Sequence, residues 1–148
     1  LIGGGDNDRL KGQRGDDTLD GGAGRDSLKG NAGDDLLLGG GSRDRLNGGA
    51  GADTLDGGAG DDILTGRGGI DTFVFSAGTD VVRGMRSNEV VDLTQAVGIE
   101  NFDDLITDHA ETVGDDLVIR DREGSRMVLE DMDFSDLFDM EFVFADIV

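Results

Sequence analysis

Apolar residues recur every nine positions along the first half of the chain. Dividing the sequence from Gly3 into nine consecutive units of nine places an apolar residue at the eighth position of each unit: Leu10, Leu19, Leu28, Leu37, Leu46, Leu55, Leu64, Phe73 and Val82. The sixth position is an aspartate in all nine units: Asp8, Asp17, Asp26, Asp35, Asp44, Asp53, Asp62, Asp71 and Asp80. A fixed period of this length is typical of solenoid proteins, in which each unit stacks on its neighbours.

The pattern predicts a turn and a strand in each unit. The first position is glycine in eight units and Phe75 in the ninth, and the glycine-rich first half predicts a tight turn with positive φ angles. Asn7, Asp16, Asp34 and Asp61, at the fifth position, are residues that tolerate the left-handed region. The last three residues are predicted to form a short strand whose middle side chain is the only core contribution. Two units complete one coil, stacked coils pair in parallel at about 4.8 Å, and apolar residues of odd units face those of even units.

Composition limits the possible classes of protein. The 148 residues include 27 glycines and no proline, which excludes collagen, while disorder stays open for a chain with net charge −20. This charge excludes nucleic acid and anionic lipid as favoured partners. There is no cysteine to form a disulfide, no apolar run long enough for stable membrane insertion, and no visible signal peptide. We expect the chain to be the C-terminal piece of a longer protein.

The predicted roll needs a ligand besides its apolar residues. One buried apolar side chain in nine cannot offset the entropy lost in ordering a glycine-rich unit. The repeated carboxylates and the turn carbonyls favour a hard cation, and calcium accepts irregular oxygen cages more readily than magnesium does. With no cysteine and one histidine, zinc has few ligands in this sequence.

The units resemble the RTX nonapeptide G-G-x-G-x-D-x-U-x of hemolysin-type calcium-binding proteins over residues 3–83. The resemblance implies an all-β fold, a right-handed parallel β-roll, with each calcium ion between turns one coil apart. Asp8, Asp26, Asp44, Asp62 and Asp80 would then share ions on a first edge of the roll, and Asp17, Asp35, Asp53 and Asp71 on a second edge. Neighbouring turns give four sites on the first edge and three on the second, and we expect five to seven ions.

The family pattern completes each shell with oxygens of the turns. The residues implied are Gly4, Asp6, Gly15, Gly21, Gly22, Ala23, Gly24, Gly30, Asn31, Ala32, Gly33, Gly39, Gly40, Gly41, Ser42, Gly48, Gly49, Ala50, Gly51, Gly57, Gly58, Ala59, Gly60, Gly66 and Gly68. Several turns depart from the pattern, and backbone strain is expected to weaken their sites; the residues concerned are Asp6 and Ser42 at position four and Gln13, Asn31 and Arg67 at position two. Because Phe75 replaces glycine in the ninth unit, the Asp62–Asp80 site is expected to be the least secure.

Glycine becomes rare after residue 83, so residues 1–83 are interpreted as the roll and residues 84–148 as an acidic cap. The cap is predicted to hold a strand over Val90–Leu93, a helix over Asn101–Thr107 capped by Asn101, a hairpin of Leu117–Ile119 with Met127–Leu129, a helical turn over Phe134–Phe138 and a strand over Phe142–Ala145. Six phenylalanines are expected to cover the open end of the roll, as solenoid termini require: Phe75, Phe102, Phe134, Phe138, Phe142 and Phe144.

Two segments extend the family resemblance. Asp71–Ser76 with Val91–Thr94 is similar to the segment that closes RTX rolls in secreted serralysin-type proteases and alginate-epimerase modules. The ending Ala145–Val148 is similar to the acidic-then-apolar terminus of type I secretion substrates; a frayed strand end is the alternative interpretation.

No catalytic motif is present in the sequence. His109 lacks the second histidine of H-E-x-x-H, and neither G-x-S-x-G nor an EF-hand loop occurs. We predict that His109 is a solvated surface residue and that this module is not an enzyme, although a longer protein containing it could be one.

Two function classes remain open. The first is a calcium-triggered module that stays unfolded inside the bacterial cell, passes a type I secretion apparatus and folds outside on binding Ca²⁺, serving an upstream passenger. The second is a calcium-stabilised adhesin or polysaccharide-binding surface module with glycans as partners. Its ice-binding variant would require a flat threonine array, and the seventh positions do not form one.

Overall fold

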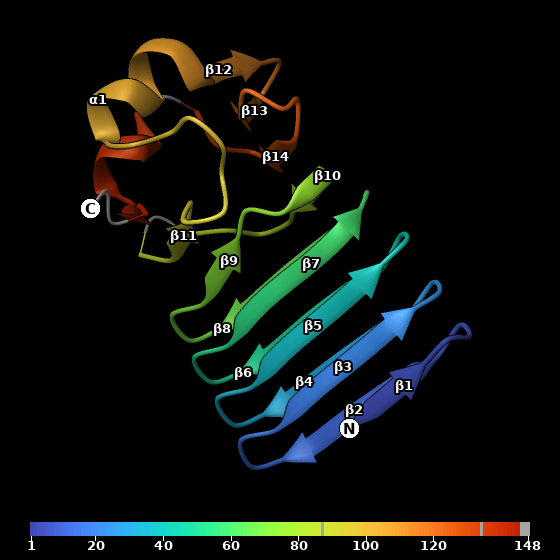
Figure 1. The fold of residues 1–148 in the computed structure, drawn as a ribbon. Helices are drawn as coiled ribbons and strands as arrows, with labels where there is room; N and C mark the ends of the chain where they lie inside the picture. The colour runs from blue at the N-terminus through green and yellow to red at the C-terminus, as the bar shows by residue number, and fades with distance from the viewer. Residues whose placement is uncertain (87, 134, 146–148) are drawn as a thin grey trace.

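The computed structural model describes residues 1–86, 88–133 and 135–145, and its repeats form a flat coil of two facing parallel sheets (Figure 1). One sheet contains β1 (Ile2–Gly4), β3 (Thr18–Ala23), β5 (Leu36–Gly41), β7 (Thr54–Gly60) and β9 (Thr72–Val74). The other contains β2 (Arg9–Arg14), β4 (Ser27–Ala32), β6 (Arg45–Ala50), β8 (Ile63–Gly68) and the end of β10 (Ala77–Val82). The predicted parallel β-solenoid is confirmed.

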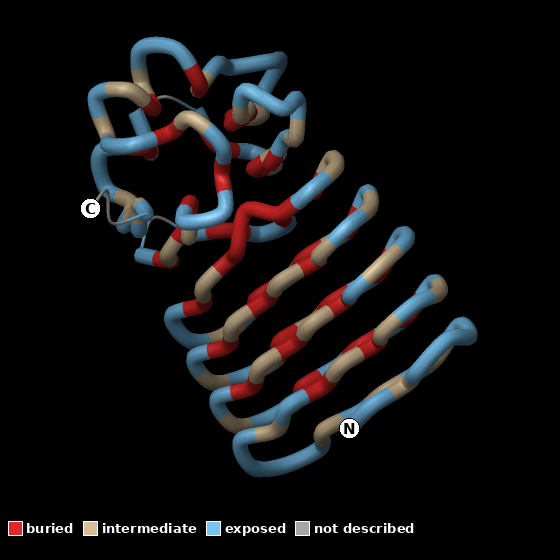
Figure 2. The backbone as a smooth tube through the Cα atoms, in the orientation of Figure 1, coloured by how far each residue is buried: buried red, intermediate tan, exposed pale blue. Residues whose placement is uncertain are grey.

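Register between coils is 18 residues throughout, which confirms that two units complete one coil. On one sheet Leu19 pairs with Leu37, Leu37 with Leu55 and Leu55 with Phe73. On the other sheet, the corresponding ladder consists of Leu10, Leu28, Leu46, Leu64 and Val82. Apart from Leu10, which is partly buried, these positions are buried, and Figure 2 shows the buried positions in rows across the strands.

The strands are longer than the sequence pattern predicted. Most span six residues, from the seventh position of one unit to the third position of the next, so the ladder includes the glycine at the first position. The eighth position is also not the only inward one, because Asp44, Asp71 and Asp80 are fully buried. A carboxylate therefore shares the interior with each leucine in the middle of the roll.

The sequence predicted left-handed backbone at the aspartates and the asparagine of the fifth position, and this prediction is wrong. Positive φ angles fall at the second and fourth positions, where they include the non-glycine residues Gln13, Asn31, Ser42 and Arg67 at 79° to 89°. Four of the five residues that depart from the family pattern in the turns thus adopt a conformation that normally favours glycine. The fifth, Asp6, does not.

The C-terminal segment continues both sheets beyond the last coil (Figure 1). Strand β11 (Val90–Asp92) pairs in parallel with β9, and β15 (Glu141–Val143) pairs with β11. On the other sheet, β14 (Arg126–Leu129) pairs with β10, followed by antiparallel β13 (Asp116–Arg120) and β12 (Ala110–Val113). The predicted strand at Val90 and the predicted hairpin are confirmed, and β12 was not foreseen.

Three short helical segments complete the cap. Helix α1 (Phe102–Asp104) begins at Asn101, whose Oδ1 accepts a hydrogen bond of 3.0 Å from the Asp104 N–H, as predicted. It continues as a π-helical turn over Leu105–His109, and a 3-10 turn spans Asp136–Asp139. The predicted helical turn began at Phe134, which lies outside the described residues, and the predicted last strand lies at Glu141–Val143 instead of 142–145.

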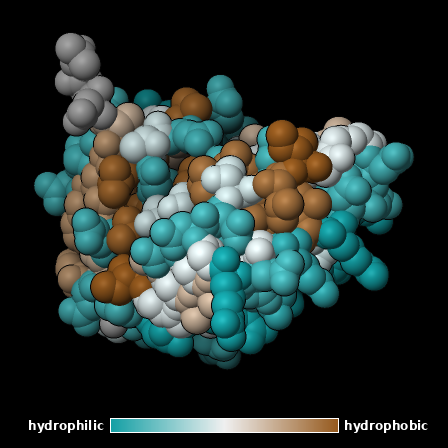
Figure 3. Space-filling view, turned by 90° about the horizontal axis from the view of Figure 1, so that it is seen from below, coloured by the Kyte–Doolittle hydropathy of each residue, from teal (hydrophilic) through white to brown (hydrophobic). Residues whose placement is uncertain are grey.

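Phenylalanines fill part of the junction between the roll and the cap. Phe75 is buried, and Phe102, Phe142 and Phe144 pack against the core. Phe138 contacts the ring of Phe102 at a centroid distance of 5.7 Å but is 69% exposed, so its predicted covering role is wrong. Seen from below, most of the visible surface is hydrophilic, with apolar residues in separate groups (Figure 3).

His109 is buried, which contradicts the prediction of a solvated side chain. Its Nδ1 lies 2.8 Å from the Arg120 carbonyl oxygen, and its Nε2 lies 3.8 Å from Asp104 Oδ2. Because β12 was missed, the residue before it was assigned to the surface. Across the described ranges, no helix is long and apolar enough to cross a membrane.

Candidate calcium sites in the turns

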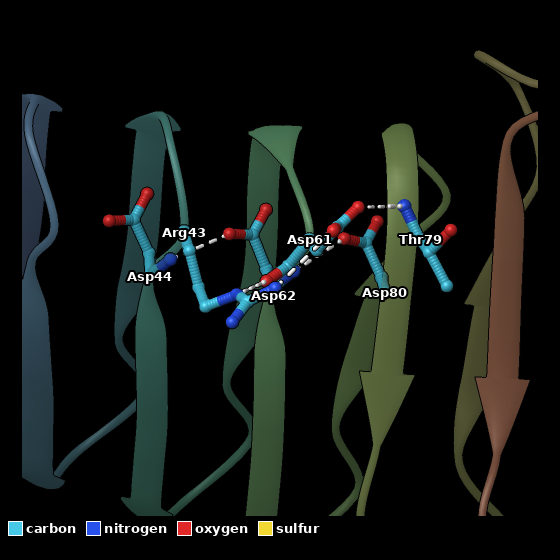
Figure 4. Close-up of polar contacts among 6 residues, drawn as sticks. All are labelled: Arg43, Asp44, Asp61, Asp62, Thr79 and Asp80. Carbon is cyan, nitrogen blue, oxygen red and sulfur yellow. Dashed lines mark hydrogen bonds and ion pairs between the residues drawn. The ribbon is translucent and has the colours of Figure 1, made fainter.

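The sixth-position aspartates meet along two edges of the roll, in the two groups that the spacing predicted. In each group the backbone N–H of one aspartate donates to Oδ1 of the aspartate one coil further on, at 2.7 to 3.1 Å. Figure 4 shows this ladder running from Asp44 through Asp62 to Asp80. Each carboxylate is therefore fixed by the preceding coil through one oxygen.

The second carboxylate oxygen is left without a protein partner. In the described part of the chain, Oδ2 is buried and makes no hydrogen bond in eight of the nine aspartates: Asp8, Asp17, Asp26, Asp35, Asp44, Asp53, Asp62 and Asp71. A buried, unpaired carboxylate oxygen is costly. Its recurrence in the first eight units fits a cation held by each of these turns.

The first-position glycine lies beside this oxygen. A Cβ on Gly21 would lie 2.5 Å from Asp26 Oδ2 and 2.6 Å from the carbonyl oxygen of Gly39, one coil further on. The same arrangement recurs at Gly39, with Asp44 Oδ2 and the Gly57 carbonyl. Oδ2 thus lies in the gap between its own turn and the next one, and the absence of a side chain keeps that gap open.

Carbonyl oxygens of the second and fourth positions approach the next turn. A Cβ on Gly24 would lie 2.5 Å from the Asp6 carbonyl oxygen, and one on Gly40 would overlap the carbonyl of Gly22. Third-position carbonyls differ, because they already accept hydrogen bonds: Ala32 from the Gly15 N–H at 2.8 Å and Ala50 from the Gly33 N–H at 2.9 Å. A cation would share these third-position oxygens with the ladder.

Burial changes the acidity of the aspartates. It raises the pKa of Asp44, Asp53 and Asp80 to about 6 and that of Asp62 to about 7, because desolvation disfavours the carboxylate. The backbone hydrogen bonds partly oppose this shift, and the charges of neighbouring aspartates add to it in Asp44, Asp53 and Asp62. A bound divalent cation would reverse this effect by stabilising the charged form.

These residues fit a calcium ion. Unpaired carboxylate oxygens and nearby carbonyl oxygens are the hard ligands that Ca²⁺ accepts in large, irregular shells. In the described residues, no three acidic or histidine side chains gather at one point, so main-chain oxygens would have to complete each shell. The sixth-position aspartates and the second- and fourth-position carbonyls would hold the ion and cancel the repulsion between coils.

The sequence prediction missed a second ladder at the fifth position. Asn7 Oδ1 accepts a hydrogen bond from the Arg25 N–H at 2.7 Å, and Asp34 Oδ1 accepts one from the Ala52 N–H at 2.7 Å. Asp16 and Asp61 make equivalent bonds, and Figure 4 shows that from Thr79 to Asp61. The repeated Asn or Asp at this position was visible in the sequence but was interpreted as a left-handed residue.

The first edge ends differently at the ninth unit. Asp80 Oδ2 accepts a hydrogen bond of 2.9 Å from the Ser76 hydroxyl, so this aspartate has both carboxylate oxygens paired. Phe75 fills the first position of this unit and is itself buried. In the neighbouring Asp62–Asp80 gap the unpaired oxygen belongs to Asp62, and the predicted weakness of that site stays a prediction.

The fold and the turns together define a parallel β-solenoid with cation-binding turns. The family model described as the RTX calcium-binding nonapeptide repeat (four copies) matches residues 2–37 and again residues 38–73. Residues 2–73 are therefore RTX repeats, a class of repeat that binds Ca²⁺. No curated protein sequence matches the chain.

A solved structure supports the fold. The crystal structure of the extracellular lipase LipA from Serratia marcescens is similar over 88% of this chain, with a TM-score of 0.50 and 19% sequence identity. The chain spans 38% of the length of that lipase. At this identity the likeness shows a common architecture, and the lipase activity is a property of that protein.

Proposed function

We propose that this chain is a secreted, non-catalytic calcium-binding module that folds outside the bacterial cell and supports type I secretion of an upstream passenger. In this proposal, residues 1–83 bind five to seven ions and residues 84–148 cap the roll and carry the export signal. The observation that carries it is the buried Oδ2 without a partner in each turn from Asp8 to Asp71. A low-calcium compartment leaves these oxygens repelling one another, whereas a calcium-rich exterior pairs them.

Circular dichroism tests the folding part of the proposal. We expect the far-ultraviolet β signal of the roll to be lost in excess EGTA and recovered when calcium, but not magnesium, is added back. An unchanged β spectrum in EGTA would contradict the proposal, because the roll would then be stable without the ion.

The export part concerns the terminus Ala145–Val148, of which residues 146–148 lie outside the described residues. Deleting these four residues is expected to abolish export through a type I apparatus while calcium-dependent folding is retained. Replacing them by a different acidic-then-apolar sequence is the matched control. Normal export of the truncated chain would refute the signal.

The surface-module alternative is supported by a basic face. The outward side chains of the β2–β4–β6–β8 sheet include the exposed Arg9, Lys11, Lys29 and Arg45, and a shallow groove there is also lined by Arg67 and Arg83. On a molecule of net charge −20, this face would suit an acidic glycan. A pull-down of calcium-loaded protein with acidic and neutral polysaccharides, comparing wild type with Arg45→Glu, tests it.

A further inference from the structure

The repeat register continues past the ninth unit into residues 84–92. This segment reads GMRSNEVVD, with Gly84 at the first position, Asn88 at the fifth, Glu89 at the sixth and Val91 at the eighth. Val91 pairs with Phe73 in the ladder. The Val90 N–H donates to the Asp71 carbonyl oxygen at 2.9 Å, as the Thr72 N–H does to Asp53 one coil earlier at 2.8 Å. Glu89 therefore occupies the register position of a tenth aspartate, although its carboxylate accepts from the Arg86 N–H and not from the preceding coil.

A comparison between the number of unpaired Oδ2 atoms and the number of gaps between aspartate turns also points to Glu89. In the first five units, the unpaired Oδ2 and a carbonyl oxygen of the next turn on the same edge both crowd the first-position glycine. The constant 18-residue register gives the unpaired Oδ2 of the following three units the same place, between its own turn and the next. Nine aspartates define seven such gaps, but eight Oδ2 atoms are unpaired. The extra oxygen belongs to Asp71, whose gap is closed on its far side by Glu89, whereas Asp80 is satisfied by Ser76.

Glu89 carries the matching unpaired oxygen. Its side chain is fully buried, and Oε1 makes no hydrogen bond to any described residue. Oε2 accepts from the Arg86 N–H at 2.9 Å, which holds the carboxylate in place from within its own turn. Burial raises the pKa of Glu89 and of Asp71, and the charge of Asp71 raises the pKa of Glu89 further. Two buried carboxylates thus face one gap.

The positive charge of Arg86 acts on both members of this pair. It lowers the pKa of both acids, but the Arg86 side chain is exposed, and the ion pairs within 4.0 Å in the described residues do not include it. It therefore leaves Asp71 Oδ2 and Glu89 Oε1 without a direct partner. A divalent ion would supply one.

We infer that Asp71 and Glu89, with carbonyl oxygens of the turn 66–71, form a further calcium site on the second edge, at the junction of roll and cap. This inference rests on the proposed calcium binding of the repeats. Its ion would join the last turn of the second edge to the segment that starts the cap. The second edge would then hold as many sites as the first.

Native mass spectrometry at saturating calcium tests the site. Glu89→Gln is expected to bind one ion fewer than wild type, because the amide can still accept from the Arg86 N–H but loses the charge. Glu141→Gln, at an exposed position of β15, is the matched control and should bind the wild-type number. Equal counts in wild type and Glu89→Gln would overturn the inference, whereas no ions in any variant would overturn the proposed function.

Anomalous scattering from crystals of the calcium-loaded wild-type chain gives a second measurement that does not depend on a folded variant. The expected result is a calcium peak between Asp71 Oδ2 and Glu89 Oε1, in addition to peaks in the gaps between aspartates. Peaks in those gaps without one at Glu89 would refute this site alone.

Discussion

The roll and the cap share two continuous sheets but fill the space between them with different groups. Between the sheets of the roll, each unit from the third onward places one apolar side chain, such as Leu37 or Leu46, together with a buried carboxylate. The cap instead gathers large apolar side chains from several elements: Leu93, Ile99, Leu105, Leu117, Ile119, Met127, Leu129 and Leu137. We therefore expect the roll to depend on a ligand for its cohesion, whereas the cap adds many large apolar side chains to the shared core.

Acidification should separate the two regions most strongly. In the metal-free roll the pKa values of Asp44, Asp53, Asp62 and Asp80 are raised to about 6 or 7, so protonation stabilises the folded state. This stabilisation is fully present below the unfolded value of about 4 and is lost as the pH rises through 6 to 7. The calcium-free roll, which we expect to be unfolded at pH 7.5, should therefore regain part of its β signal at pH 5. Circular dichroism in calcium-free buffer across this pH range measures this, and an unchanged spectrum would contradict it.

Core truncations compare the regions directly. Leu46→Ala and Leu117→Ala each remove a fully buried side chain and should lower the free energy of unfolding in calcium by about 3 kcal/mol, measured by urea denaturation. In EGTA we expect the Leu46 substitution to have no effect, because the roll is already unfolded. Leu117→Ala should still speed amide hydrogen exchange in β13. An effect of Leu46→Ala in EGTA would show that the roll retains its core without the ion.

Alanine substitutions at two glycines of one turn give a more specific test of the calcium site. A Cβ on Gly39 would lie 2.5 Å from the Gly57 carbonyl oxygen and 2.7 Å from Asp44 Oδ2, whereas one on Gly41 would meet nothing closer than 4.0 Å. Gly39→Ala should therefore destabilise the calcium-loaded chain by about 2 kcal/mol and weaken its calcium binding in a calorimetric titration. Gly41→Ala should change neither quantity; similar behaviour of the two variants would mean that the gap is not the binding site.

The smallest effect is expected at the helix cap of the C-terminal segment. Asn101→Ala removes the hydrogen bond to the Asp104 N–H and should cost about 1 kcal/mol without altering the number of calcium ions bound. Asn101→Asp, which retains the acceptor, is the control. A change in ion count would show that cap and roll are energetically coupled at this distance.

The sequence was most informative where each unit repeats the same physical task. Because one slip in register would place Leu28 or Leu46 outside, the nine-residue period determined the coil length, the two ladders and the two rows of aspartates. It failed where one residue type serves two purposes. Asn7 and Asp61 suit a left-handed turn, but their side chains instead bond the next coil.

The cap was harder to predict because its contacts have no period. His109 was assigned to the surface since nothing in its local sequence indicates β12, whose position depends on pairing with β13. Glu89 was overlooked because the tenth unit departs from the repeat: it has glutamate in place of aspartate at the sixth position and Met85 at the second. In both cases the residue is placed by a partner on another segment, and only the three-dimensional pairing reveals it.

Because the aspartate ladder has a direction, losing a coil at its N-terminal end has a different consequence from losing one beside the cap. In the first seven units the aspartate N–H relies on the following coil for its acceptor, and the Oδ2 atom lies in the gap before that coil. Removing coils from the N-terminal end leaves only carboxylate oxygens that water can reach. Removing coils next to the cap would instead leave aspartate N–H groups without their acceptors and would open the gaps in which the Oδ2 atoms lie. An array of this kind can vary in length at its beginning while its final coils are retained.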